Sequence, residues 1–317
     1  MTLLTPFKIE YDARLVEEAV MLRIAGHPDE EQLRAGRDRI YEIADEDLRE
    51  QRFRDFHSTW FERLKLGHPV AAALRERLIL TERGRRFCVA PAASTQDEGA
   101  DLHGARSDST EQVNAVVVIR LRPVAFLDPV GLLAFLRHEL THVADMLDPA
   151  FSYQRELPKS AAGPAYDNLV RERYRVLWDS WIDGRLLRLG WASLRVREKR
   201  LAEFAAAFSL EGAEAEQKFQ QLFDSGSQTH GALAALALSA SGLEGAPNGR
   251  ARPCPLCRFP TFGLVDGRDT RIPEWTLEEI TSDFPHWRPE QGLCCQCADL
   301  YQSRVISRQA ESVLPRI

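Results

Sequence analysis

The chain lacks any apolar run long enough to cross a membrane; the longest candidate, residues 232–240, is short and rich in alanine. It also has no surplus of positive charge, since 41 Lys and Arg stand against 47 Asp and Glu and the net charge is −6. No overall field therefore draws it to nucleic acid or to an anionic membrane. Residues 1–7 are too short for a secretory signal. We expect a cytoplasmic protein of about one to three domains that does not bind membranes.

Cysteine is scarce over most of the chain, where Cys88 stands alone. The other five crowd into the last quarter and are Cys254, Cys257, Cys294, Cys295 and Cys297. They form C-x-x-C pairs, which are typical of a metal site and not of a disulfide framework. Cys254, Cys257, Cys294 and Cys297 would make a closed, structural four-thiolate zinc site, with Cys295 as a substitute for Cys294. This segment resembles a zinc ribbon with a longer insert between its two pairs.

The most informative motif is H-E-x-x-H, at residues 138–142. Histidines four residues apart, here His138 and His142, share one face of a helix, so both rings can reach a single metal ion. Glu139, beside the first histidine, can then deprotonate a zinc-bound water. The motif therefore predicts a catalytic metal site with a glutamate as the general base.

The residues around the motif predict a strand followed by a helix. A β-branched run at residues 115–121 is typical of a strand, and Asp128 with Pro129 is typical of a helix start. Apolar residues then recur at helical spacing up to Asp148-Pro149. This order resembles the zincin metallopeptidases over about residues 85–190. The resemblance implies hydrolysis of a protein or peptide substrate, with the strand at residues 116–121 pairing with the extended substrate.

A catalytic zinc needs three protein ligands, so one more must be found besides the two histidines. The metzincin pattern would use Asp148, but it has a glycine where Asp145 stands and needs a methionine turn farther downstream. The methionines are Met1, Met21 and Met146. The chain departs from the metzincin pattern in both respects.

Residues 179–185 instead resemble the E-x-x-x-D helix of gluzincins, with aspartate in place of the usual glutamate. Apolar residues point nearly all round this turn, so its acids should be buried and need a cation. We rank Asp179 first as the ligand, with Asp183 bracing a motif histidine. Asp183 and then Glu172 are the next candidates for the ligand. A salt-bridge cluster is the alternative without metal, and its available partners are Arg175, Arg185 and Arg188.

The predicted fold is α+β, with a mostly helical zincin-like core and a small sheet. We expect N-terminal helices at residues 1–84, the core at 85–224, a linker at 225–252 and the ribbon at 253–317. Within these parts we expect a long amphipathic segment from Leu33 to Leu64, a strand at 86–90 and a loop at 94–112. A helical region at 164–200 and a further helix at 198–223 complete the prediction.

Three functions compete. The leading one is a zinc metallopeptidase with one catalytic and one structural zinc, in which Tyr153, Tyr166 or Tyr174 could hold the oxyanion. The second is a non-catalytic interaction protein with a vestigial site, against which the intact Glu139 argues. The third follows from the order of core and ribbon, which is similar to that of SprT-like proteases acting on DNA-bound proteins.

Two features weigh against that third function. The SprT-like family takes its third ligand from a later histidine, and we expect the later ones here, His230 and His286, to lie outside the core. From residue 250 onward nine Arg and Lys balance nine Asp and Glu. A phosphate-binding module should be basic, so we do not expect nucleic acid as a partner.

Overall fold

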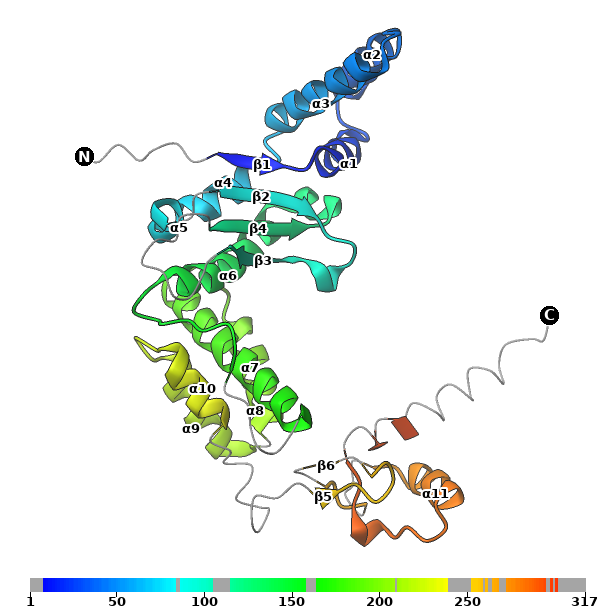
Figure 1. Cartoon of the computed structure of the whole chain (residues 1–317), viewed down its shortest axis with the longest axis vertical. Coiled ribbons are helices and arrows are strands. Elements are labelled where there is room, and N and C mark those ends of the chain that lie inside the picture. Colours follow the sequence, from blue (N-terminus) through cyan, green and yellow to red (C-terminus); the bar gives the residue numbers. More distant parts are fainter. Residues whose placement is uncertain are drawn as a thin grey trace, which may run out of the picture. The chain divides into compact units, whose positions relative to one another are not determined.

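The computed structural model combines many helices with a small mixed sheet, so the predicted α+β class is confirmed (Figure 1). The described residues are 8–83, 86–104, 115–157, 164–208, 210–238, 252–258, 260–261, 264–267, 272–294, 297–298 and 300–301. They fall into a larger unit (Met1–Glu156, Leu177–Glu203 and Gly212–Leu233) and a smaller one (Leu157–Val176, Phe204–Glu211 and Ala234–Ile317). The predicted domain boundaries stay predictions. No helix in the described ranges is long and apolar enough to span a membrane.

The sheet has the strand order β1-β2-β4-β3. Its strands are β1 (Ile9–Tyr11), β2 (Arg86–Pro91), β3 (Gly99–His103) and β4 (Val116–Leu121). The first two neighbouring pairs are parallel, whereas β3 runs antiparallel to β4. Alternate side chains of β4, including Val117 and Ile119, are fully buried, as the period of two along a strand requires. The predicted strands at 86–90 and 115–121 are therefore confirmed.

The expected loop at residues 94–112 was wrong in part, because it contains β3 and a short 3₁₀ helix, Thr95–Asp97. Its remainder, residues 105–112, lies outside the described residues. The strand β3 changes the edge of the sheet. β4 lies between β2 and β3, so the strand expected to receive a substrate is internal and β3 is the outer one. A short strand with glycine and aspartate has a weak local signal, and here its pairing with β4 stabilises it.

Within residues 8–83 the N-terminal region folds mainly into helices, as predicted, and the strand β1 departs from that prediction. The helices are α1 (Ala13–Ile24), α2 (Glu30–Tyr41), α3 (Glu46–Arg63), α4 (His68–Arg75) and α5 (Leu78–Arg83). The long segment expected from Leu33 to Leu64 divides into α2 and α3. Asp45 explains the break, because its carboxylate accepts the backbone N–H of Leu48 and caps the start of α3.

Helix α6 (Pro129–Leu147) carries the H-E-x-x-H motif through the core. Asp128 accepts the backbone N–H of Gly131 at 2.9 Å, so the predicted cap is present. Leu136, Leu140 and Val143 are fully buried, and the helix contacts α4, α5 and β3. The apolar face of α6 therefore fixes the helix on the sheet and leaves the motif face for chemistry.

The helical region expected at 164–200 is two helices, α7 (Pro164–Arg188) and α8 (Arg195–Phe208), followed by α9 (Gly212–Phe223) and α10 (His230–Leu238). Gly190 ends α7 with a φ of 71°, a conformation that glycine adopts without strain. The backbone N–H of Gly190 and that of Trp191 bond back to the carbonyls of Leu187 and Leu186. Gly212, at φ 58°, is the first residue of α9.

Candidate metal centres

Helix α6 places His138 and His142 one turn apart, with their ring centroids 5.1 Å from each other. Helix α7 brings Asp179 to them. The Oδ1 atom of Asp179 lies 3.0 Å from Nε2 of His142 and 3.6 Å from Nε2 of His138. All three donor atoms lie within 4.8 Å of one another. Two imidazole nitrogens and one carboxylate oxygen thus converge on one point.

These distances fit a metal ion. Ligands at 2.0–2.1 Å from a tetrahedral zinc lie about 3.3 Å apart, close to the two distances from Asp179 Oδ1. The carboxylates of the site are also shielded from solvent, since Asp179 is only 6% exposed and Asp183 only 4%. Buried carboxylates need hydrogen bonds, cations or a metal. The donor set therefore suits a metal with three protein ligands and an open position.

Asp183 lies one turn beyond Asp179 and braces a histidine. Its Oδ1 atom is 2.8 Å from Nδ1 of His138, on the side of the ring opposite Nε2. An acid on one ring nitrogen fixes the tautomer and leaves the other nitrogen to bind the metal. The geometry thus matches the arrangement that the spacing predicted for Asp179 and Asp183.

The other two candidates for the third ligand do not join this group. Glu172 pairs with Arg175 at 2.6 Å, and its side chain is 55% exposed. Asp148 ends α6 and accepts the backbone N–H of Ala150 at 2.9 Å. Within the described residues, the group contains His138, His142 and Asp179. The spacing in the sequence left Glu172 and Asp148 open as ligands, whereas the structure brings Asp179 to the two histidines.

Charge around the site controls the pKa values of its groups. Burial lowers the pKa of His138, but its hydrogen bonds to the carboxylates of Asp179 and Asp183 outweigh burial and raise the pKa to about 9. Burial likewise opposes ionisation of Asp179, but His138, His142 and Arg200 hold the pKa of its carboxyl far below the usual range. The pKa of Asp183 is lowered for similar reasons. Without metal, His138 is therefore a cation that holds a proton against two carboxylates.

The arginines expected to neutralise Asp179 and Asp183 have other partners. Arg175 pairs with Glu172, and Arg188 donates to backbone carbonyls at the end of α9. Arg185 makes two hydrogen bonds to Asp145, at 2.9 and 2.6 Å. The expected salt-bridge partners were thus wrong, and the cation is Arg200 of α8, which sequence reasoning missed.

Arg200 contacts three carboxylates. Its Nε is 2.6 Å from Oδ2 of Asp183, and its Nη1 is 3.2 Å from Oδ2 of Asp179 and 2.6 Å from Glu203. The residue retains only 8% of its exposure. Two buried acids one turn apart signal that a cation must be near, but nothing in the local sequence indicates which one.

Glu139 lies beside β3 and is not one of the three grouped donors. Its Oε2 atom accepts the backbone N–H of Ala100 at 3.3 Å. A Cβ added to Gly99 would lie 3.2 Å from the same oxygen. Gly99 therefore gives this carboxylate room beside the edge strand. The acid is held in place and is not used as a fourth ligand.

Aromatic side chains border the site. The ring of His142 meets Trp178 edge-on at 4.4 Å, and Trp178 packs against Tyr153 at 5.7 Å. Trp178 also donates to Asp145 at 2.8 Å. Among the three candidate tyrosines, Tyr153 is thus connected to a motif histidine. Tyr174 is buried in the smaller unit, and the side chain of Tyr166 lies outside the described residues.

His230 was expected outside the core, and the structure differs. It retains 3% of its exposure, its backbone N–H bonds to the carbonyl of Phe151, and its ring lies 5.6 Å from Tyr153. Burial lowers its pKa, so it is neutral at pH 7. It is not one of the grouped donors. His230 instead packs behind the aromatic border of the site.

A second group of donors is formed by Cys254, Cys257, Cys294 and Cys297. The Sγ atoms of Cys254 and Cys297 are 3.9 Å apart, and those of Cys257 and Cys294 are 3.8 Å apart. Thiolates at 2.3 Å from a tetrahedral zinc would be about 3.8 Å apart. Cys295 lies outside the described residues.

The surroundings of these cysteines form a small core of their own, in the smaller unit. It is built from Leu256, Ile272, Ile280, Trp287, Leu293 and Tyr301, with three of the four cysteines buried among them. Burial raises the pKa of Cys254, but backbone N–H groups, including that of Cys294, outweigh it and lower the pKa to about 7. The cluster is closed and well suited to a structural ion.

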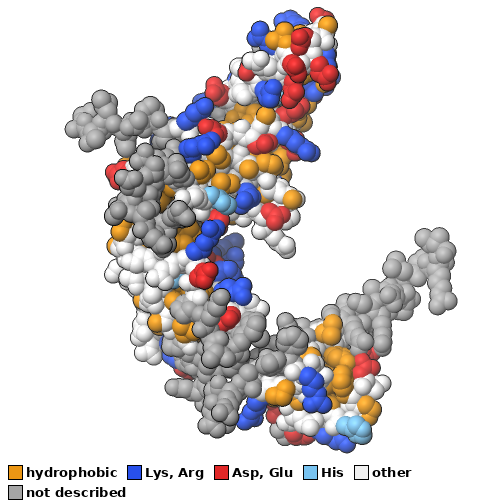
Figure 2. All heavy atoms as spheres, viewed as in Figure 1, with side chains coloured by type: hydrophobic (Ala, Val, Ile, Leu, Met, Phe, Trp, Pro, Cys, Tyr) orange, Lys and Arg blue, Asp and Glu red, His pale blue; other side chains and the backbone are white. Residues whose placement is uncertain are grey.

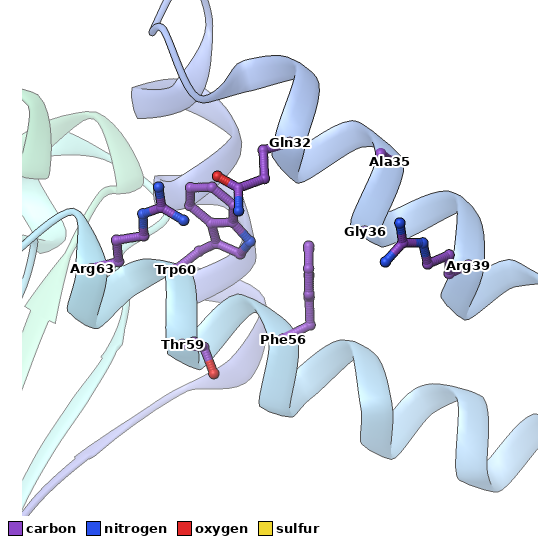
Figure 3. Close-up of a pocket in the computed structure, with 8 residues that line it drawn as sticks. All are labelled: Gln32, Ala35, Gly36, Arg39, Phe56, Thr59, Trp60 and Arg63. Carbon is purple, nitrogen blue, oxygen red and sulfur yellow. The ribbon is translucent and has the colours of Figure 1, made fainter.

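A cavity of about 430 Å³ lies between α2 and α3. Figure 3 shows Phe56 and Trp60 projecting from α3 toward α2. The guanidinium of Arg63 lies 4.5 Å from the Trp60 ring and pairs with Asp29. A Cβ on Gly36 would come within 2.6 Å of the Phe56 ring, so glycine allows this close packing. No metal-ligand group lies in this cavity among the described residues.

Comparisons with known proteins give no further guidance: no family model, no curated protein and no solved structure matches the chain. The two donor groups are therefore the features of the chain that indicate a function.

Proposed function

We propose that the chain is a zinc-dependent peptidase of the zincin type, with its catalytic site at His138, Glu139, His142 and Asp179. The convergence of three donors beside an acid that is not a donor carries the proposal. A purely structural ion would need a fourth ligand and would leave no task for Glu139. An open metal position next to a held carboxylate is the arrangement that hydrolysis requires.

Each residue has a task in the proposed reaction. Zinc held by His138, His142 and Asp179 would supply Lewis acidity, making water acidic and a carbonyl electrophilic. Glu139 takes a proton from the attacking water and passes it to the leaving amine. The N–H of Ala100 holds the Glu139 carboxylate on the β3 side. Tyr153, next to Trp178, is the tyrosine best placed to donate to the developing oxyanion.

The edge of the sheet supports a peptide as the substrate. β3 pairs with β4 on one side and is the last strand in the order. An extended peptide could add by backbone hydrogen bonds to its other side, which pairs with no strand among the described residues. Because Glu139 already contacts β3 at Ala100, a peptide bound there would pass the general base.

We assign a structural zinc to Cys254, Cys257, Cys294 and Cys297, in the manner of a zinc ribbon. Nucleic acid has no part in the proposed activity. On the face shown in Figure 2, Lys and Arg side chains are interspersed with Asp and Glu over the described surface. We therefore expect added DNA to leave the rate of peptide hydrolysis unchanged.

The test uses a peptide library with cleavage detected by mass spectrometry. The Glu139→Gln variant should retain its metal but cleave at least about 10²-fold more slowly, because the proton acceptor is lost. Asp148→Asn is the matched control, since this acid lies at the end of the same helix and outside the donor group, and it should cleave at the wild-type rate. Hydrolysis that survives in Glu139→Gln would overturn the proposed mechanism. A zinc-loaded wild type that cleaves nothing would favour the interaction protein.

A further inference from the structure

Arg200 contacts one oxygen of each of the two carboxylates on α7, Asp179 and Asp183. The inner oxygen of Asp179, Oδ1, faces the histidine Nε2 atoms, whereas the outer oxygen, Oδ2, faces Nη1 of Arg200 at 3.2 Å. Asp183 is arranged in parallel: its Oδ1 bonds to His138 and its Oδ2 to Nε of Arg200 at 2.6 Å. One guanidinium thus engages the outer oxygens of both acids.

The guanidinium is itself fixed. Glu203, three residues farther along α8, binds Nη1 at 2.6 Å. The side chain of Arg200 is 10% exposed, so water competes little for these hydrogen bonds. Opposite charges and the planar fork of arginine make such contacts strong and directional. Arg200 is therefore a rigid element of the site.

This arrangement bears on how Asp179 can bind a metal. A carboxylate can bind through one oxygen or through both, and a second oxygen would occupy the position that water needs. The charge-assisted hydrogen bond to Arg200 competes for that second oxygen. We propose that Arg200 is a positioning residue that keeps Asp179 a one-oxygen ligand and so leaves a coordination position open. This inference rests on the proposed metal site.

The matched control is Arg185, which forms a comparable ion pair with Asp145. That pair also joins α7 to α6, and the side chain of Asp145 is 7% exposed. Arg185 bonds to Asp145 and lies over the Trp181 ring, and Asp145 accepts a further hydrogen bond from Trp178. These hydrogen bonds go to residues other than His138, His142 and Asp179. Loss of Arg185 should therefore disturb packing without freeing the second oxygen of Asp179.

The experiment replaces the metal at the proposed site of His138, His142 and Asp179, called the His-Asp site below, with Co²⁺. A mild chelator strips the more labile metal, Co²⁺ is added, and the absence of a thiolate charge-transfer band shows that the cysteines have not taken it up. Visible absorption of Co²⁺ weakens several-fold when the ion passes from four to five or six ligands. We expect this weakening in Arg200→Ala, partial weakening in Arg200→Lys, and the wild-type spectrum in Arg185→Ala. Guanidinium at low millimolar concentration should restore the spectrum of Arg200→Ala.

The outcomes separate the inference from the proposed function. Uptake of Co²⁺ by the wild type with an unchanged spectrum in both Arg200 variants would overturn the positioning role alone. Equal weakening in Arg200→Ala and Arg185→Ala, without rescue by guanidinium, would also overturn it, since packing would then explain the change. A wild type that takes up no Co²⁺ at this site would refute the metal site and the inference together.

Discussion

At the scale of single residues, His138 would have to give up a proton to bind the proposed metal ion. Its pKa of about 9 means that the metal-free site carries a proton at neutral pH. Asp179 and Asp183 stabilise that proton. In the proposed site, Asp179 would bind the metal and Asp183 would brace His138 once the proton has left. Binding of a metal therefore releases a proton from His138.

The loss of this proton makes the affinity for a metal depend on pH. A group that must lose a proton before it binds loses affinity as pH falls below its pKa, so the apparent affinity for zinc should rise by about tenfold per pH unit up to pH 9 and then level off. Competition with a chromophoric chelator between pH 6.5 and 9 measures it. Affinity at the His-Asp site that does not change over this range would contradict the raised pKa of His138.

The sequence predicted the residues that have a local pattern. The i, i+4 spacing identified His138 and His142, and the same spacing on α7 identified Asp179 and Asp183. Arg200 has no such pattern: it lies 17 residues after Asp183 on another helix. Only the packing of α8 beside α7 shows which of the neighbouring arginines neutralises the acids.

At the scale of helices and strands, α7 must lie close to α9. A Cβ built on Gly184 would come 1.9 Å from the backbone carbonyl oxygen of Phe223, a distance that no side-chain rearrangement relieves. Gly184 follows Asp183 directly, so the contact that fixes α7 against α9 also fixes the bracing carboxylate. Close packing at this glycine thus supports the site.

Gly184→Ala should therefore lower the free energy of unfolding by about 2 kcal/mol or more and weaken metal binding at the same time. Urea unfolding and zinc titration measure the two effects. Gly231→Ala in α10 is the matched control, because nothing lies within 4 Å of its added Cβ and alanine favours helices. The free energy of unfolding of Gly231→Ala should equal that of the wild type or exceed it by up to about 1 kcal/mol. Equal effects of the two substitutions would refute the close contact.

The elements themselves were predicted with uneven success, for physical reasons. α6 was placed correctly because a cap, an N-terminal proline and a long apolar pattern agree. β3 was missed because a five-residue edge strand depends on its partner β4 and not on its own sequence. The breaks at Asp45 and Gly190 each depend on one residue, and so the helical spacing ran past them.

At the scale of the whole chain, the two donor groups belong to different compact units. The core around the cysteines is small, so its stability should depend on the metal. Cys254→Ala should lose one equivalent of zinc and the order of the small core around the cysteines, while the proposed site at His138, His142 and Asp179 should keep its metal. Limited proteolysis with mass mapping checks this, and Cys88→Ala, outside both groups, is the control. A Cys254→Ala chain with an intact C-terminal core would contradict a structural zinc.

The most direct test of the central claim is the metal content of the purified chain by elemental mass spectrometry. We predict two equivalents of zinc per wild-type chain and one in Asp179→Ala, with two retained in Asp148→Asn and Glu139→Gln, because Asp179 alone among these acids is assigned as a ligand. The account is contradicted by a wild type with a single zinc that Asp179→Ala keeps and Cys254→Ala loses. The histidines of α6 would then hold no zinc.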